Sequence, residues 1–216
     1  MKNIAELQKD VQDAIKWEPL LNAAEIGVTV KDGVVTLTGV VDNYTKKSEA
    51  EDATKNVAGV KAVVEKIEVK FSSFGKKHDN EIAIEVLNAF KRNWSVPNDK
   101  VKVKVENGWS TLEGELEYNY QRDAAKDAVK NLPSETGVSN NITIKSTEEE
   151  KVEKADIESA LKRNWSIYDN EIDVKVAGHE ATLTGTVNSL YQKEEAGRIA
   201  YNAHGVYSVD NELIVD

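Results

Sequence analysis

The side chains of this chain that could do chemistry are few, and histidine is the first type to examine. The three histidines are His78, His179 and His204, and no spacing between them matches a metal-ligand motif. The chain has no cysteine, and it has neither a glycine-rich phosphate loop nor a Gly-x-Ser-x-Gly turn for a serine nucleophile. The sequence therefore predicts no catalytic residue, no metal site, no cofactor and no enzyme activity, and we expect each histidine to be an ordinary surface residue.

A basic and aromatic segment is the most distinctive feature outside the apolar pattern. It reads Lys91-Arg92-Asn93-Trp94-Ser95 and recurs as Lys162-Arg163-Asn164-Trp165-Ser166. Basic residues in a last helical turn suit the helix dipole, and a large aromatic residue just after a helix usually packs over its end. Lysine, arginine and tryptophan are also the residue types found at the headgroup depth of a membrane. Packing is the plain interpretation, and an interfacial anchor is the alternative that gives the segment a function.

These segments recur because one unit of about 70 residues is written three times. A constant offset of 75 and then 71 residues brings Gly39 over Gly114 and Gly185. The expected domains are residues 1–70, 79–146 and 151–216, joined by short polar linkers. In the first copy the helix ends in Lys16-Trp17-Glu18-Pro19, so its tryptophan comes two positions earlier.

Each copy has the same change of hydrophobic period. Leu7, Val11 and Ile15 recur at helical spacing, and Ile26, Val28 and Val30 then alternate as in a strand with one face exposed. A two-residue turn, a returning strand, an alanine-rich helix and a last strand follow. The sequence predicts an α+β fold of three two-layer α-β-β-α-β modules, each with a three-stranded mixed sheet and two helices on one face.

Glycines mark the turns and the middle of the returning strand. Asp32-Gly33 and Asn107-Gly108 favour type I′ hairpins, whereas Gly178-His179 favours type II′. The glycine within the returning strand predicts a bulge or the close approach of a helix backbone. The structural glycines expected on these grounds are Gly33, Gly39, Gly59, Gly108, Gly114, Gly178, Gly185 and Gly205.

Trp109 completes the candidate binding residues. It follows a hairpin turn, at a position where the other copies have Val34 and Glu180, and this variation in polarity predicts a surface location. Glu148-Glu149-Glu150 favours a solvated linker over a cation site, because adjacent carboxylates cannot converge on one ion without further ligands. The candidate interfacial patch comprises Lys91, Arg92, Trp94, Trp109, Lys162, Arg163 and Trp165.

Net charge and composition limit the kinds of partner that the chain can bind. The chain of 216 residues has a net charge of −10, which disfavours nucleic-acid binding. No apolar run is long enough to span a bilayer. The segment Met1–Asp10 lacks the apolar core of a signal peptide. We expect a cytoplasmic protein from the chain as given, or a periplasmic one if a signal peptide was removed.

The pattern Val-x-Val-x-(Asp/Asn)-Gly-x-x-Thr-Leu-x-Gly, followed by an alanine-rich helix and Gly-Val-x-x-Val, resembles the BON domain (bacterial OsmY and nodulation). It is seen at Val28–Gly39, Val103–Gly114 and Val174–Gly185. The second copy departs from it with Ser134-Glu135 in place of Gly-Val, and the third departs with Gly178-His179 in place of (Asp/Asn)-Gly, which puts the geometry of both turns in doubt. The resemblance implies the α-β-β-α-β fold already expected.

For function, the resemblance implies a non-enzymatic protein of the osmotic or envelope stress response. Its partners would be a phospholipid membrane surface or an envelope protein. The alternative is a cytoplasmic stress sensor that binds a monovalent cation, potassium, or a small solute. Both remain open at the level of sequence, because no residue pattern selects the ligand.

Overall fold

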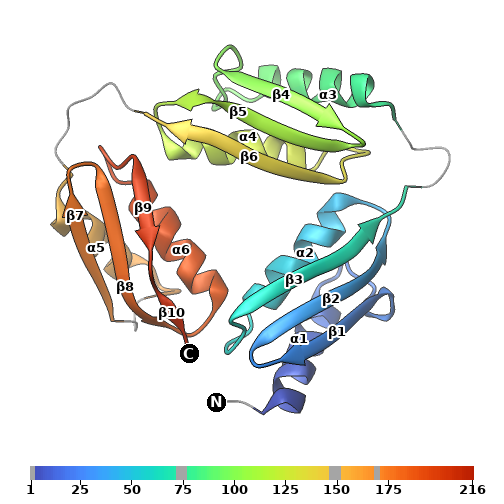
Figure 1. Cartoon of the computed structure of the whole chain (residues 1–216). Coiled ribbons are helices and arrows are strands. Elements are labelled where there is room, and N and C mark those ends of the chain that lie inside the picture. Colours follow the sequence, from blue (N-terminus) through green and yellow to red (C-terminus); the bar gives the residue numbers. More distant parts are fainter. Residues whose placement is uncertain (1–2, 72–76, 146–151, 168–170) are drawn as a thin grey trace. The chain divides into compact units, whose positions relative to one another are not determined.

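We describe a computed structural model of the chain over residues 3–71, 77–145, 152–167 and 171–216. Three modules, each with two helices and a three-stranded mixed sheet, follow one another (Figure 1). The predicted α+β class and its threefold repetition are confirmed. The limits expected for the domains stay predictions, and Glu148-Glu149-Glu150 and most of both linkers lie outside the described residues.

The elements have the following bounds. The first module has α1 (Ile4–Trp17), a short 3₁₀ helix (Ala23–Glu25), β1 (Ile26–Lys31), β2 (Val34–Val41), α2 (Tyr44–Lys55) and β3 (Ala62–Val69). The second has α3 (Asp79–Arg92), β4 (Val101–Glu106), β5 (Trp109–Leu116), α4 (Asn119–Lys130) and β6 (Gly137–Ile144). The third has α5 (Lys154–Arg163), β7 (Ile172–Ala177), β8 (Glu180–Val187), α6 (Leu190–Tyr201), β9 (Ser208–Asn211) and β10 (Ile214–Val215).

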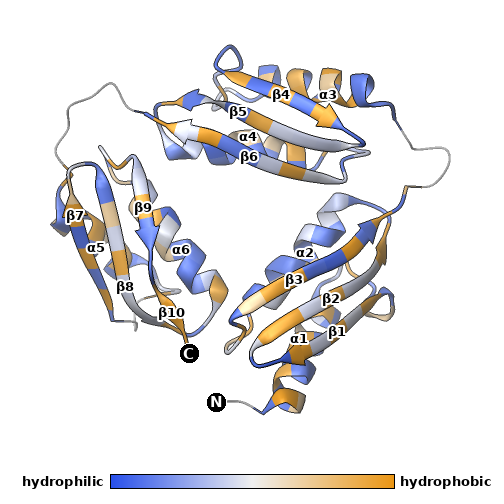
Figure 2. Ribbon diagram, viewed as in Figure 1, coloured by the Kyte–Doolittle hydropathy of each residue, from blue (hydrophilic) through white to orange (hydrophobic). Residues whose placement is uncertain are grey.

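The returning strand is central in every sheet. In the second module β5 pairs antiparallel with β4 and parallel with β6, and in the third β9 and β10 are two segments of the last strand, both parallel to β8. Hydrophobic and hydrophilic residues alternate along the strands (Figure 2). Leu37, Leu112 and Leu183 are fully buried on the inner face of the three central strands, and the other face is open.

The first helix of each module buries one stripe. In α1 these residues are Leu7, Val11 and Ile15, as predicted, and a capping box between Asn3 and Glu6 fixes where the helix begins. In α3 the stripe is Ile82, Val86 and Phe90, and in α5 it is Ile157 and Leu161. Because the stripe faces the sheet, the end of each first helix is held firmly by the core.

The glycine of the central strand is required by a close backbone contact. Gly114 has φ +152°, and a Cβ there would overlap the carbonyl oxygen of Lys100, the residue before β4. Gly39 and Gly185 stand in the same relation to Glu25 and Glu171. No bulge is seen in either ladder, because β4 pairs with β5 in continuous register up to Gly114, where that ladder ends, and β6 pairs with β5 in continuous register across it. The approaching backbone is the segment that leads into the first strand, and not a packed helix.

The hairpin turns differ as predicted. Both central residues have positive φ in Asp32-Gly33 and in Asn107-Gly108, as a type I′ turn requires. In the third turn only Gly178 has positive φ, at +62°, and His179 does not, as expected for type II′. His179 is more than a surface residue. Its Nδ1 lies 2.7 Å from the carbonyl oxygen of Gly205, and its ring stacks on Tyr207 at 4.0 Å. The ring therefore ties the hairpin to the turn before the last strand.

The departure at Ser134 leaves the turn geometry intact. Ser134 has φ +71°, close to the +92° of Gly59 and the +77° of Gly205. A non-glycine residue in this left-handed region is strained by about 1 kcal/mol. The second module therefore keeps the turn of the other two modules, with local strain at Ser134.

Candidate functional site

The candidate site is a tight turn that follows the first helix of each module. We call these segments the post-helix turns: Glu18–Leu21, Asn93–Val96 and Asn164–Ile167. In each, the backbone N–H of the last residue donates to the carbonyl of the first, at 3.1, 3.0 and 3.3 Å. The last residue then enters or approaches the core, and Val96 and Ile167 are only 3% and 2% exposed.

Trp94 and Trp165 lie at the exposed part of their turns, and Trp17 directly precedes the first turn. Trp94 is 91% exposed and Trp165 is 89% exposed. In the first module Trp17, the last residue of α1, is 86% exposed, and Leu20 in the turn itself is 57% exposed. The expected packing of tryptophan over the helix end is therefore wrong. Val96 and Ile167 occupy the core position near the helix end, so each tryptophan points into solvent.

An asparagine makes two of the turns rigid. Asn93 Oδ1 accepts a hydrogen bond from the backbone N–H of Ser95 (3.1 Å), and Asn164 Oδ1 accepts from both the N–H (2.9 Å) and the hydroxyl (2.7 Å) of Ser166. Such Asx turns hold the chain direction locally. The tryptophan between them is therefore presented on a fixed backbone.

The third module adds a brace from α6. Asn164 Nδ2 donates to the Glu195 carboxylate (2.9 Å), and Gln192 Nε2 donates to the carbonyl oxygen of Ser166 (2.7 Å). Arg198 donates two hydrogen bonds to Glu195, both 2.7 Å, and this guanidinium lowers the pKa of the Glu195 carboxyl. The acceptor for Asn164 thus stays charged.

We predict that Asn164→Ala destabilises the third module by about 2 kcal/mol, because it removes three hydrogen bonds, one of them to a carboxylate. The matched change Asn93→Ala should cost the second module about 1 kcal/mol. Urea unfolding followed at amide resolution by NMR measures both. Equal losses would show that the brace from α6 adds no stability.

Basic residues lie beside the exposed tryptophans. Lys91 and Arg92 end α3, Lys162 and Arg163 end α5, and all four are exposed. The structure therefore brings Lys91, Arg92 and Trp94 together, and does the same for the equivalent three residues of the third module.

The second module adds an apolar face that sequence reasoning missed. Ile84 is 57% exposed and Leu87 is 43% exposed, and they share the outer face of α3 with Lys91, at spacings of three and four residues. The equivalent positions in the first module are Lys9 and Gln12. The signal was present in the sequence as a second apolar stripe on an otherwise amphipathic helix.

Trp109 does not belong with this cluster. It begins β5 and follows the hairpin turn, whose Asn107 and Gly108 N–H groups donate to Asp79 at the start of α3. Trp94 lies beyond the other end of that helix, which at 14 residues is roughly 20 Å long. Trp109 is 42% exposed, donates from Nε1 to Ser139 Oγ (2.9 Å) and covers Gly137. Its role is packing on the open face of the sheet.

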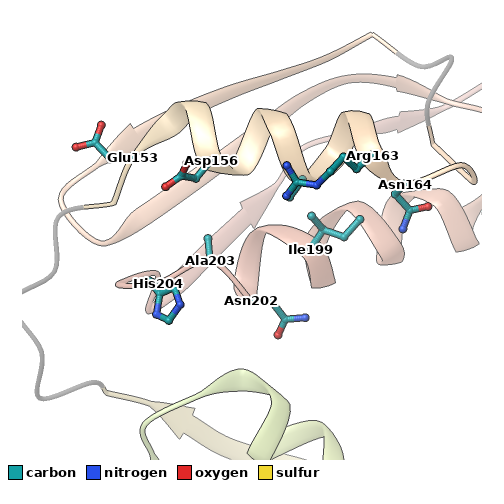
Figure 3. Close-up of a pocket in the computed structure, with 9 residues that line it drawn as sticks. Glu153, Asp156, Arg163, Asn164, Ile199, Asn202, Ala203 and His204 are labelled. Carbon is teal, nitrogen blue, oxygen red and sulfur yellow. The ribbon is translucent and has the colours of Figure 1, made fainter.

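A groove of about 710 Å³ lies between α5 and α6 in the third module (Figure 3). Glu153 and Asp156 lie at one end, and Arg163 and Asn164 lie at the other. Ile199, Asn202, Ala203 and His204 contribute from the side of α6. Arg163 therefore borders the groove as well as the post-helix turn.

Two further features were considered over the described ranges: a metal site and a membrane-spanning helix. Over these residues, no three His, Asp or Glu side chains gather where they could hold a metal ion. Each helix of the described ranges is too short or too polar to cross a bilayer.

Known proteins with similar sequence or structure were compared with this chain. Osmotically-inducible protein Y of Escherichia coli (strain K12) is 27% identical over 129 residues, which are 58% of this chain and 64% of that protein. Two solved structures of CdsD, a structural protein of the type III secretion system of Chlamydia trachomatis, are 19% and 17% identical. The first alignment covers 100% of this chain and 100% of the CdsD chain, and the second covers 96% of this chain and 91% of the CdsD chain. The TM-score is 0.27 for each, so these likenesses carry no argument.

The strongest match is to a family. The model of the BON domain matches three times, at residues 3–70, 78–146 and 152–216. These ranges take in nearly the whole chain and coincide with the three α-β-β-α-β modules. The chain therefore belongs to the BON-domain family.

Proposed function

We propose that this protein is a non-enzymatic binding protein of the osmotic or envelope stress response, and that its post-helix turns bind the surface of an anionic phospholipid membrane. The BON-domain family and the osmotically inducible relative support the role in stress. The observation that carries the membrane assignment is the exposure of Trp17, Trp94 and Trp165, at 86%, 91% and 89%.

Exposed tryptophan is unfavourable in water and favourable at a membrane interface. Burial of apolar surface contributes about 25 cal/mol per Å². A tryptophan presents roughly 200 Å², so an insertion that buries half of one side chain contributes about 2 kcal/mol. A turn that is already rigid loses little further entropy on binding. The post-helix turns of the second and third modules therefore combine an exposed tryptophan with a rigid backbone.

The second module is the strongest of the three sites. Beside Trp94, the outer face of α3 offers Ile84 and Leu87 for insertion, and Lys91 and Arg92 for lipid phosphates. The outer face of α3 thus offers both residue types that bind at a membrane interface, apolar and basic. The third module, residues 151–216, has a net charge of −5, against −2 for residues 1–70 and −2 for residues 79–146, so it should bind an anionic surface more weakly than the second.

The affinity for an anionic membrane depends on the charges of the protein and on the number of linked binding sites. The net charge of −10 opposes approach to an anionic membrane, whereas the basic residues at the turns attract phosphates over a Debye length of about 8 Å at physiological salt. Each turn should therefore bind weakly. Linked weak sites gain avidity wherever the linkers permit joint engagement.

The test is co-sedimentation of the intact protein with large vesicles of phosphatidylglycerol and phosphatidylcholine, and with vesicles of phosphatidylcholine alone. We expect binding to the anionic vesicles that weakens when the salt is raised from low to physiological, because the basic residues are exposed. Absence of binding to either vesicle would remove the lipid assignment and leave an envelope protein as the partner.

The groove of the third module favours a second candidate function, the binding of potassium or of a small solute. Glu153 and Asp156 line this groove, and carboxylate oxygens are ligands of hard cations in proteins. Such a ligand would bind the folded module alone and so raise its melting temperature.

For this candidate we predict a higher melting temperature in potassium chloride than in sodium chloride at equal ionic strength. The Asp156→Asn variant should lose the difference, since it removes one negative ligand from the groove. Calorimetry measures both. The same melting temperature in the two salts would leave only screening and would exclude selective potassium binding.

A further inference from the structure

The core of the second module contains a carboxylate where the other modules are apolar. Glu135 has no solvent exposure, and it takes the position of Val60 in the first module and Val206 in the third. Ser110, which is also fully buried, stands opposite it, where the other modules have Val35 and Ala181. A buried polar pair has thus replaced an apolar one in a single module.

The carboxyl group of Glu135 is incompletely satisfied in its charged form. Glu135 Oε1 lies 2.7 Å from Ser110 Oγ, whereas Oε2 is buried and has no hydrogen-bond partner in the described part of the chain. A carboxylate with one bond and no solvent is costly to bury. A neutral carboxyl group can instead donate its proton to the Ser110 hydroxyl, which leaves Oε2 as an uncharged carbonyl oxygen.

Glu135 lies within the segment that holds the hairpin turn. The next residue, Thr136, donates its N–H to the carbonyl oxygen of Gly108 (2.8 Å), and the Asp79 carboxylate accepts from the N–H groups of Asn107 (2.8 Å) and Gly108 (2.9 Å). The start of α3, the hairpin turn and the segment before β6 therefore meet at one junction. Asp79 of α3 and Glu135 of the segment before β6 each contribute a carboxyl group to it.

The charges around this junction favour a neutral Glu135. Burial is the main cause that raises its pKa to about 7, the hydrogen bond from Ser110 opposes the rise, and the charge of Asp79 adds to it. Other charged or titratable residues at the ends of the elements that meet here are Lys77, His78 and Glu81 at the start of α3, Glu106 at the end of β4 and Lys130 at the end of α4. Lys77 is engaged in an ion pair with Glu85.

We propose that Glu135 makes the second module a proton-sensitive switch, in which the protonated side chain keeps the junction of α3, the hairpin turn and β6 closed, and loss of the proton loosens it. The first and third modules, with valine at this position, lack the switch. This property goes beyond membrane binding and does not depend on it.

The direction of the pH effect follows from proton linkage. An unfolded or opened segment releases the proton near the ordinary pKa of glutamate, about 4.5, whereas the closed segment holds it to about pH 7. Between these two values the opened state binds fewer protons, so the closed state loses stability as the pH rises. One proton corresponds to a rise of about tenfold in the opening constant for each pH unit, and the constant levels off above pH 7.

The test is amide hydrogen exchange of the full chain between pH 5 and pH 8, with rates corrected for the intrinsic effect of pH. The amide of Thr136 reports the junction, and the equivalent amide of Lys61, which donates to Gly33 in the first module, is the internal control. We expect the opening constant at Thr136 to rise about tenfold per pH unit up to about pH 7, and that at Lys61 to stay constant.

Two variants separate Glu135 from its neighbours. Glu135→Val installs the residue of the other modules, and Glu135→Gln keeps the size and shape of the neutral side chain if valine perturbs the core. Both should abolish the pH dependence at Thr136. A pH dependence that persists in Glu135→Gln, or one that is equal at Thr136 and Lys61 in the unchanged protein, would overturn the proposal.

Discussion

The double variant Trp94→Ala, Trp165→Ala should bind anionic vesicles at least about 100-fold more weakly than the unchanged protein. Each exposed tryptophan that inserts contributes about 2 kcal/mol, and 1.4 kcal/mol corresponds to a factor of ten. The two side chains are 91% and 89% exposed, so their removal should leave the circular dichroism spectrum and the melting temperature unchanged. Titration with vesicles gives the binding constants.

Two single changes refine this prediction. Trp94→Ala should weaken binding more than Trp165→Ala, because only the second module adds Ile84 and Leu87 on the same helix. Trp109→Phe is the matched control, since Trp109 packs on Gly137 at the other end of the module and should leave binding unchanged. Undiminished binding of the double variant would exclude the post-helix turns as the membrane site.

The substitution Gly185→Ala should destabilise the third module by about 3 kcal/mol. Gly185 has φ +128°, and an added Cβ would meet the carbonyl oxygen of Glu171. Backbone strain at such a φ costs on the order of 1–3 kcal/mol, and displacement of the neighbouring strand adds to it. This contact recurs in all three modules, so the result should hold for Gly39 and Gly114 as well.

Gly178→Ala in the same module is the matched control, because it introduces backbone strain without a steric clash. Gly178 has φ +62°, and nothing lies within 4 Å of the position that a Cβ would take. Its replacement should cost about 1–2 kcal/mol, from strain alone. Denaturant unfolding monitored by NMR assigns each loss to the third module. Equal losses for the two variants would show that the contact with Glu171 is readily relieved.

The fold could be predicted from sequence because the apolar periods are local and are written three times. The stripe of Leu7, Val11 and Ile15 and the alternation from Ile26 onwards require only the geometry of a helix and a strand. The reason for Gly114 could not be predicted, because the backbone it meets, that of Lys100, is brought there by strand pairing. The sequence indicated that this glycine is structurally required, but it could not identify the backbone segment that contacts it.

The candidate site was located from sequence, but its geometry was not. A tryptophan after a helix usually packs, and the sign that Trp94 does not is Val96, which takes the core position two residues later. Trp109 was grouped with the basic segment because it is an aromatic residue after a turn, at a position whose polarity varies between the copies. The length of α3 separates the two tryptophans, and that follows from the fold and not from composition.

Sequence also marked Ser134-Glu135 as a departure from the family pattern without revealing its consequence. Glutamate is almost never fully buried unless it is paired, so sequence alone gives no reason to place Glu135 in the core. Only the pairing of β5 with β6 shows that Ser110 lies close enough to accompany it. The repeats then supply the comparison, because the same position is Val60 and Val206 in the other modules.

The most direct test of membrane binding is the depth of the tryptophans. In a Trp109→Phe background, where Trp17, Trp94 and Trp165 remain, emission is recorded with anionic vesicles whose lipids carry bromine at known depths. We expect a blue shift and strongest quenching by bromine near the headgroups, because tryptophan prefers that depth. Unshifted emission, without quenching at any depth, on vesicles that nevertheless retain the protein would contradict insertion of the post-helix turns.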